Sequence, residues 1–172
     1  MAQRVRRWTL NDLTTIQDVL WMTWVKSYSS FIPETDLKSY FSEHYDLDSV
    51  KKLFNNPTVD GFVAEVEGKV VGFMRTIHDS EENRYYVSSL YVLPDYQSMG
   101  LGIEFMKVAA GEAKKFNLNK IWVGVMVQNT QALDWYKKMG YVSTRIEPFT
   151  MGNSTVGHHI GYVPVEKLLE SK

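Results

Sequence analysis

The sequence contains no cysteine among its 172 residues. This absence excludes disulfide bonds, thiolate metal sites and a cysteine nucleophile. It leaves the redox compartment open, although a reducing cytosol is compatible with it. We therefore expect a cytoplasmic protein.

The chain also lacks an apolar run long enough to cross a bilayer. Arg4, Arg6 and Arg7 lie near its start, but the polar segment 11–18 follows them in place of the apolar core of a signal peptide. The net charge is only −1, whereas nucleic-acid binding requires a strongly basic face. We expect neither a membrane nor a nucleic-acid partner.

The composition is that of a globular protein, with 44% hydrophobic and 23% charged residues. A chain of 172 residues is long enough to bury one sizeable core. No repeat, low-complexity tract or linker divides it. The sequence therefore predicts a single domain over residues 1–172.

The stretch 85–116 predicts a strand, a glycine turn and a helix in succession. Tyr85 to Val92 is aromatic and β-branched, as expected of a buried strand, and Pro94 ends it. The glycines of Gln97-Ser98-Met99-Gly100-Leu101-Gly102 allow open φ values and the close approach of a ligand. The following helix presents unpaired N–H groups and its positive dipole end at the same point. Together these features predict an anion site, most naturally for phosphate.

Periodicity and capping residues predict the remaining elements. Strands are expected at residues 3–8, 62–66, 70–76, 120–127, 141–149 and 156–163. Helices are expected to begin at residue 10, at 35 or 36, after a cap at Asp46 or Asp48, at 100 and at 129. This order is typical of an α/β or α+β domain with a mixed sheet and the glycine loop near its middle.

Two common phosphate-binding patterns do not fit the loop. The Walker pattern needs Gly-Lys-Ser/Thr, and the dinucleotide fingerprint needs a third glycine where Phe105 stands. The order Gln-x-x-Gly-x-Gly after a strand ending Leu90-Tyr91-Val92-Leu93-Pro94 instead resembles the acetyl-CoA loop of the GNAT superfamily of N-acetyltransferases. For two glycines taken alone, an ordinary strand-to-helix turn is the alternative.

The segment Asn129–Tyr141 strengthens this resemblance. The superfamily commonly shows Asn…Ala-x-x-Phe/Trp-Tyr-x-x-x-Gly-Phe/Tyr, and NTQALDWYKKMGY matches that pattern. Asn129, Ala132 and Tyr136 stand at i, i+3 and i+7, so they share one helix face. The run from Trp122 to Gly152 looks like the PaiA-type polyamine acetyltransferases. The resemblance implies a mixed, mostly antiparallel central sheet flanked by helices, with strands splayed at the acetyl-CoA site.

The resemblance also implies an acetyl-CoA-dependent enzyme. Backbone groups of Leu90 and Val92 would bond to the pantetheine arm, and the N–H of Leu90 would stabilise the oxyanion. Tyr136 would protonate the leaving sulfur. Lys138 would contact the 3′-phosphate, although a solvated lysine is an equal alternative. The implied cofactor-binding residues are Leu90, Tyr91, Val92, Gln97, Ser98, Met99, Gly100, Leu101, Gly102, Asn129, Ala132 and Lys138.

The sequence does not single out the base that takes a proton from the attacking amine. Many relatives carry a glutamate near the position of Ser88, where this chain has two serines. The remaining candidates are a water chain, Glu34, His78, Asp79, His158 and His159. His158 and His159 are neighbours on a strand and point to opposite faces, so they make a poor metal pair and we expect no metal.

The acceptor is expected to be a small polyamine such as spermidine or spermine. In GNAT folds the first two helices and the last hairpin border the acceptor site, and here they carry aromatic and acidic residues that suit a cationic amine. The predicted substrate-binding residues are Trp24, Tyr28, Glu34 and Asp36. The alternatives are core packing for the aromatic residues, a protein N-terminus or lysine as acceptor, and a CoA-binding regulator without catalysis. A homodimer stays open.

Overall fold

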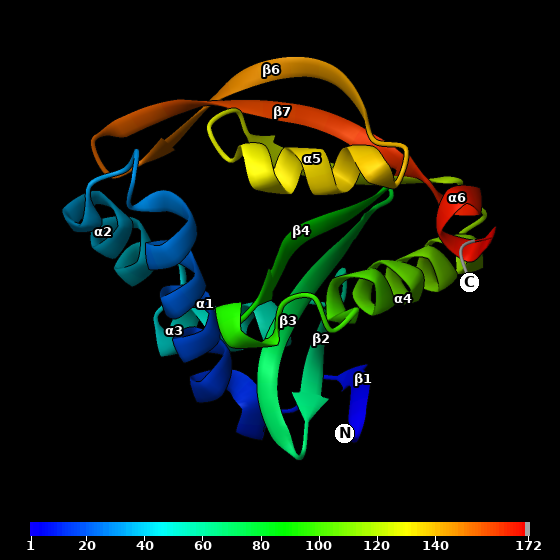
Figure 1. Cartoon of the computed structure of the whole chain (residues 1–172), viewed down its shortest axis with the longest axis horizontal. Coiled ribbons are helices and arrows are strands. Elements are labelled where there is room, and N and C mark those ends of the chain that lie inside the picture. The colour runs from blue at the N-terminus through cyan, green and yellow to red at the C-terminus, as the bar shows by residue number, and fades with distance from the viewer. Residues whose placement is uncertain (171–172) are drawn as a thin grey trace.

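The computed structural model describes residues 1–170, whose strands form one seven-stranded sheet in the order β1-β2-β3-β4-β5-β7-β6 (Figure 1). Neighbouring strands are antiparallel except for β4 and β5, which are parallel. The strands are β1 (Gln3–Arg7), β2 (Val59–Val66), β3 (Lys69–Asp79), β4 (Arg84–Val92), β5 (Lys120–Met126), β6 (Val142–Met151) and β7 (Ser154–Pro164). The sheet is thus mixed and mostly antiparallel, as predicted.

Helices cover this sheet on both faces. The helices are η1 (Leu10–Asp12), α1 (Leu13–Tyr28), α2 (Glu34–His44), α3 (Leu47–Phe54), η2 (Pro94–Tyr96), α4 (Leu101–Lys115), α5 (Thr130–Lys138) and α6 (Val165–Glu170). Local chemistry sets several of their starts. Asp46 caps α3, because its Oδ1 accepts the N–H of Ser49 at 2.8 Å. Asn129 caps α5 through a 3.3 Å bond from the N–H of Ala132.

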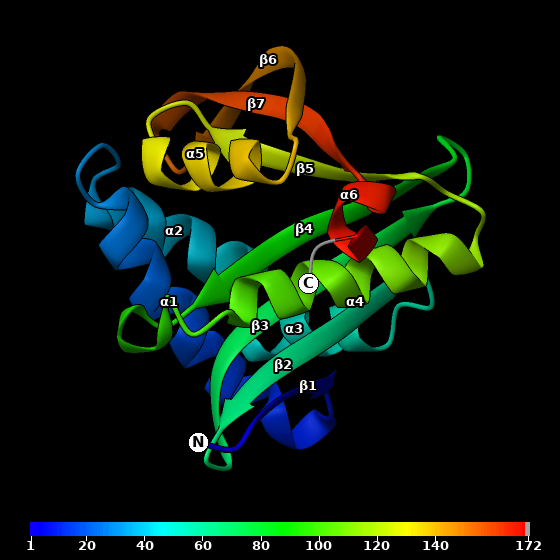
Figure 2. The ribbon, with the colours of Figure 1, turned by 45° about the vertical axis from the view of Figure 1, so that its right-hand side comes forward.

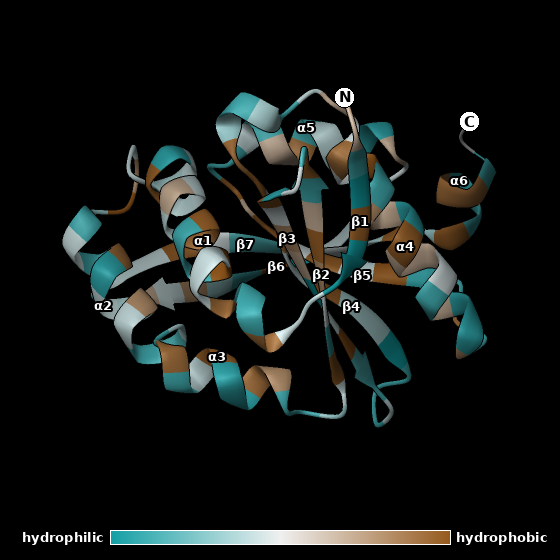
Figure 3. Ribbon diagram, turned by 90° about the horizontal axis from the view of Figure 1, so that it is seen from below, coloured by the Kyte–Doolittle hydropathy of each residue, from teal (hydrophilic) through white to brown (hydrophobic). Residues whose placement is uncertain are grey.

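Two hydrophobic clusters hold these layers together. One joins α4 and α5 to the sheet around Phe105, Met106 and Ile121, which are fully buried. The other cluster joins α1, α2 and α3 to the opposite face of the sheet, and it includes Leu20 and Trp24. Figure 3 shows hydrophobic stretches in the central strands and on the helices against them. Burial of each large side chain stabilises the fold by about 1.5–3 kcal/mol, so both faces of the sheet are firmly covered.

The β4–β5 pair opens partway along its length. Its parallel pairing covers only three positions and ends at Val87 and Val123. On the other side of β4, the register with β3 shifts at the same level, which leaves Ser88 as the extra residue of a β-bulge. The bulge bends β4, and beyond it the two strands diverge toward their carboxyl ends (Figure 2). The splay implied by the family resemblance is therefore present, next to a local defect in the sheet.

The structure differs from the sequence-based expectations mainly at the ends of elements. The first helix begins with a 3-10 turn before α1, and β3 extends to Asp79. The short helix α6 was not predicted, and it packs on α4 through Val165 and Leu168. Within residues 1–170, none of the helices has the length and apolar character needed to span a membrane.

Candidate functional site

A cleft of about 1050 Å³ lies at the splay between β4 and β5. Its walls come from α1, β4, β5, the loop before α4, α5 and the β6–β7 hairpin. Of the residues predicted for the site, those that line it are Trp24, Tyr28, Leu90, Tyr91, Val92, Gln97, Ser98, Gly100, Leu101, Gly102, Asn129, Ala132, Tyr136 and Lys138. Met99, Glu34 and Asp36 are not among its lining residues.

The glycine loop adopts the conformation that an anion site needs. Ser98 and Gly100 both have positive φ, at 69° and 82°. The backbone angle favours glycine at position 100, and a Cβ built there would meet no atom within 4 Å, so open space lies in front of the loop. The N–H of Glu104 bonds to the carbonyl of Gly100, so the N–H groups before it in α4 have no intrahelical acceptor. They are free to bind a pyrophosphate.

Other residues of the loop have structural roles. The side-chain amide of Gln97 donates to the carbonyl of Val92 at 3.0 Å and ties the loop to the end of β4. Met99 packs against the cluster under α4. A Cβ on Gly102 would lie 2.8 Å from Cζ2 of Trp135, so this glycine lets α4 and α5 approach each other. The loop is therefore held by contacts with the end of β4, with the cluster under α4 and with α5.

Tyr136 reaches the cleft from α5. Only 7% of its surface is exposed, and no hydrogen-bond partner of its phenol is found within residues 1–170. Burial raises its pKa above the usual value, and Tyr28 and Tyr141 add to the shift. Tyr28 comes from α1 on the other face of the sheet, so the two phenols act on each other at the splay. The phenol of Tyr136 stays protonated at neutral pH and is able to donate a proton.

The aromatic residues of α1 form the far wall of the cleft. The hydroxyls of Tyr28 and Tyr91 are 3.0 Å apart, and burial raises the pKa of Tyr28 to about 12. Trp24 is 3% exposed and packs at 5.2 Å from the ring of Tyr45. These residues are thus part of the core and of the cleft wall at once. Core packing is therefore compatible with a position in the wall of the cleft for these aromatic residues.

Sequence reasoning missed Arg75 and Tyr45 of this wall, whereas Ser88 and His158 were considered in the search for the general base. Arg75 of β3 stacks on Tyr45 and donates from Nε to the Oγ of Ser88 at 2.8 Å. Phe149 and His158 of the β6–β7 hairpin complete the wall, with their rings 5.1 Å apart. All five residues line the cleft. No local motif marks them, because β3, β4 and β7 meet only through the sheet.

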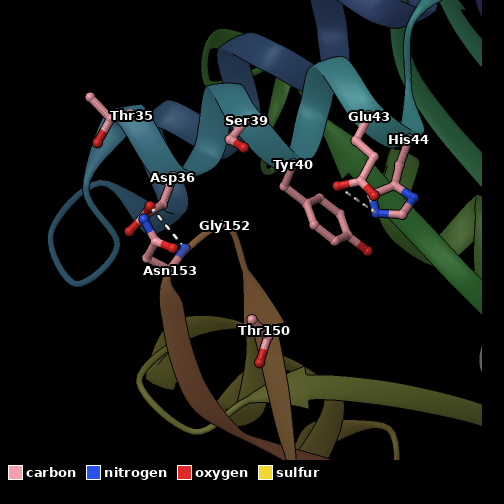
Figure 4. A pocket seen from close by; sticks show the side chains of 9 residues that line it. All are labelled: Thr35, Asp36, Ser39, Tyr40, Glu43, His44, Thr150, Gly152 and Asn153. Carbon is pink, nitrogen blue, oxygen red and sulfur yellow. Dashed lines mark hydrogen bonds and ion pairs between the residues drawn. The ribbon is translucent and has the colours of Figure 1, made fainter.

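The predicted acidic residues lie outside the cleft. Asp36 belongs to a neighbouring pocket of about 420 Å³ between α2 and the tip of the β6–β7 hairpin (Figure 4). It accepts the N–H of Asn153 at 3.0 Å and the hydroxyl of Ser154, and these bonds lower its pKa. Glu34 is exposed and pairs with Lys38 at 3.2 Å. Asp36 therefore joins α2 to the hairpin, whereas Glu34 lies on the surface.

The acidic pocket and the cleft share one wall residue, Tyr40. Its ring lies 5.8 Å from that of Phe149 on the cleft side. On the pocket side it is followed by Glu43, whose side chain is 72% exposed and lies 3.7 Å from the Nε2 of His44. Figure 4 shows Tyr40 between α2 and the hairpin. The cleft and the pocket are therefore neighbours at this ring.

Residues 18–141 match the family model of the acetyltransferase (GNAT) family. Among curated proteins, the N-alpha-acetyltransferase of Sulfurisphaera tokodaii is 27% identical over 154 residues, which is 83% of this chain and 82% of that protein. The family match covers the loop, both strands of the splay and α5.

Solved structures agree in fold. The PaiA N-acetyltransferase from Thermoplasma acidophilum, in complex with coenzyme A, has a TM-score of 0.81 at 20% identity and covers 95% of this chain and 99% of its own. The spermidine N-acetyltransferase from Vibrio cholerae, in complex with CoA and spermine, has a TM-score of 0.71 at 20% identity and covers 98% of each chain. At this identity the likeness establishes a common fold.

Proposed function

The chain belongs to the acetyltransferase (GNAT) family, and on that premise we propose that it transfers an acetyl group from acetyl-CoA to a primary amine of a small polyamine. GNAT enzymes use acetyl-CoA, so the acyl donor follows from the family. The acceptor is the part we propose. We also propose that residues 1–172 form a single domain, since the seven strands of the described residues share one sheet.

The cleft suits direct attack in a ternary complex. In our proposal the loop at Gly100 and the first turn of α4 bind the pyrophosphate, and the unpaired edge of β4 beyond Ser88 binds the pantetheine arm. The N–H of Leu90 stabilises the negative charge on the thioester oxygen. Tyr136 gives its proton to the leaving sulfur. Asn129, Ala132 and Lys138 border the cofactor from α5.

The observation that carries the polyamine proposal is an aromatic cleft that shares the wall residue Tyr40 with a neighbouring pocket lined by acidic residues. A polyamine is long, flexible and multiply charged, so it needs aromatic faces for its methylenes and ammonium groups and a carboxylate at a distance. The cleft supplies the rings of Tyr28, Tyr40 and Phe149, and the pocket supplies Glu43 and Asp36. The distal ammonium would thus lie near Glu43 while the reacting amine faces the splay.

Release of free CoA measured with spermidine, spermine, putrescine and an N-terminal peptide tests this acceptor. We expect spermidine or spermine to have the highest kcat/KM. In Glu43→Gln the KM for spermidine should rise more than kcat falls, because a distal charge binds ground and transition states alike. Glu166→Gln, which removes an exposed negative charge from α6, is the charge-matched control. If the wild-type protein prefers the peptide, the assignment of a polyamine as the acceptor is wrong.

Arg75 favours a protein N-terminus as the second candidate. Its guanidinium lines the cleft beside Ser88, and it suits a carbonyl or carboxylate of a peptide better than a polycation. The 27% identity to an N-alpha-acetyltransferase points the same way. If Arg75 serves a peptide, Arg75→Gln should raise the KM for the peptide by about tenfold or more. If the acceptor is a polyamine, the same change should lower the KM for spermidine by removing a like charge.

A further inference from the structure

His158 of β7 lies over the point where the β4–β5 pair opens. A Cβ built on Gly124 would lie 2.2 Å from Nε2 and 2.3 Å from Cε1 of His158, so the imidazole edge occupies the space that this glycine leaves. Gly124 is the first residue of β5 beyond the last pair with β4, which ends at Val123. Gly124 and His158 both line the cleft. The ring nitrogen is therefore placed at the mouth of the splay.

The imidazole is on the acceptor side of the sheet. It packs against Phe149, which in turn contacts Tyr40 of α2, and all three residues line the cleft. The other three histidines are placed differently, and His44 lines the acidic pocket and not the cleft. His159 bonds through Nδ1 to the Oγ of Ser143 at 2.9 Å, and His78 stacks on Phe116 at 3.8 Å. Neither is among the residues of the cleft.

The surroundings of His158 favour its neutral form. Burial lowers its pKa below the ordinary value, and His159 acts in the same direction. A hydrogen bond with the backbone of Gly124 and the charge of Glu147 on β6 oppose the shift without reversing it. The titratable residue of α2 that lines the cleft is Tyr40, and the charged residue of β3 that lines it is Arg75. A neutral imidazole has a free lone pair at pH 7, as a base requires.

We propose that His158 is the general base of the reaction, accepting a proton from the acceptor's ammonium group at the splay. This inference rests on the proposed N-acetylation of an amine in this cleft. In this proposal His158 takes the role of the glutamate that many relatives carry near the position of Ser88. It also explains why β5 carries a glycine at 124, since any side chain there would displace the imidazole.

The step balances in protons and electron pairs. His158 takes one proton from the ammonium, and the freed nitrogen lone pair forms a bond to the thioester carbon while the carbonyl pair moves to oxygen. Collapse of this intermediate re-forms the carbonyl and breaks the C–S bond. Tyr136 protonates the thiolate, and the second proton on the new amide nitrogen restores the phenol. His158 then releases its proton to water.

The first test is the pH dependence of kcat/KM in His158→Gln, assayed with whichever amine the wild-type protein acetylates. The wild-type profile should show an acidic limb with a pKa below 6.5, in addition to the limb from the amine itself. In the variant we expect a loss of about 10²–10⁴-fold and disappearance of the lower limb. His159→Gln is the matched control and should keep both. An unchanged lower limb in His158→Gln would overturn the proposal.

A second variant tests the geometry without removing the imidazole. Gly124→Ala should displace the ring and lower kcat with little change in the Kd of CoA, whereas Gly111→Ala, which meets no atom within 4 Å, should leave kcat unchanged. Full activity of Gly124→Ala would also contradict the proposal.

NMR separates this inference from the choice of acceptor. In the wild-type protein, the imidazole signals of His158 should titrate below pH 6.5 and should shift when CoA and an acetylated amine are added together. Those of His159 should not shift. A polyamine that fails as acceptor leaves these expectations intact, whereas a His158 that titrates normally and ignores both ligands overturns the base assignment.

Discussion

The two glycines of the loop are required for different physical reasons. Gly100 has a φ of 82° and open space around it, so the constraint is on its backbone and on what must fit in front of it. Gly102 has no unusual angle, but a Cβ there would collide with Trp135. One motif thus combines a ligand site with a helix contact.

Substitutions at Gly100 should separate strain from obstruction. A side chain at positive φ costs about 1–2 kcal/mol per residue, and a branched one adds bulk at the proposed pyrophosphate site. We expect Gly100→Ala to weaken CoA binding modestly and Gly100→Val to weaken it at least about tenfold, by calorimetry. Equal CoA affinity in wild type and Gly100→Val would refute the phosphate assignment.

Tyr136→Phe should lower turnover without unfolding the protein. The phenol has no hydrogen-bond partner in the described part of the chain, so loss of the hydroxyl should change the free energy of unfolding by less than about 1 kcal/mol. A positioned general acid contributes about 10²–10⁴-fold, and kcat should fall by that factor at unchanged CoA affinity. Turnover near wild type with several amines would make Tyr136 a packing residue.

Contacts between elements keep the cleft open. The β4–β5 pairing ends at the level of the bulge at Ser88, and the contact of Gly102 with Trp135 sets how closely α4 and α5 approach each other. The spacing of these two helices therefore sets the distance between the glycine loop before α4 and Tyr136 on α5, which bind one cofactor in our proposal.

Gly102→Ala should destabilise the protein through this helix contact. The added Cβ lies 2.8 Å from Trp135, and overpacking of this kind costs about 1–3 kcal/mol. Urea unfolding should show the loss, and it should shrink in a Trp135→Phe background, where the colliding ring atoms are gone. The same loss in both backgrounds would mean that the backbone of α4, and not Trp135, resists the change.

For the whole molecule, one buried charge cluster joins the N-terminal strand to the sheet. Arg6 pairs with Asp12 at 2.8 Å and with Glu65 at 2.7 Å, and both acids are less than one-tenth exposed. Hydrogen bonds from Arg6 lower the pKa of both carboxyls below their ordinary values. Their stabilising contribution is therefore present above the unfolded-state pKa values and is lost as pH falls through the folded-state values.

Acid should weaken the fold through this cluster. We expect the free energy of unfolding to fall below about pH 4.3, the unfolded value of a glutamate. Arg6→Met should cost about 3–5 kcal/mol at pH 7, because it leaves the buried carboxylate of Asp12 without a cationic partner and Glu65 with Arg4 alone, and should flatten the acid dependence. Arg4→Gln is the control. The Arg4 side chain also pairs with Glu65 but is 69% exposed, so its loss should cost less than about 1 kcal/mol. An Arg6→Met profile parallel to wild type would contradict this account.

Local patterns determined the elements and the cofactor side of the cleft. The strand before Pro94, the glycine turn and the helix after Gly100 follow from residue types close together in the chain, and they lie where they were expected. The placement of Asn129 and Tyr136 on one side of α5 follows from helical spacing, and both line the cleft. Such features depend on a few neighbouring residues, so the sequence by itself determines them.

Only the tertiary structure decided which residues meet on the proposed acceptor side of the cleft. Glu34 and Asp36 looked equivalent in sequence, but the docking of α2 on the β6–β7 hairpin binds Asp36 to Ser154 and leaves Glu34 in solvent. His158 was one of several open candidates until sheet pairing set it over Gly124. Residues far apart in the chain meet there through strand register and helix packing, which no local pattern records.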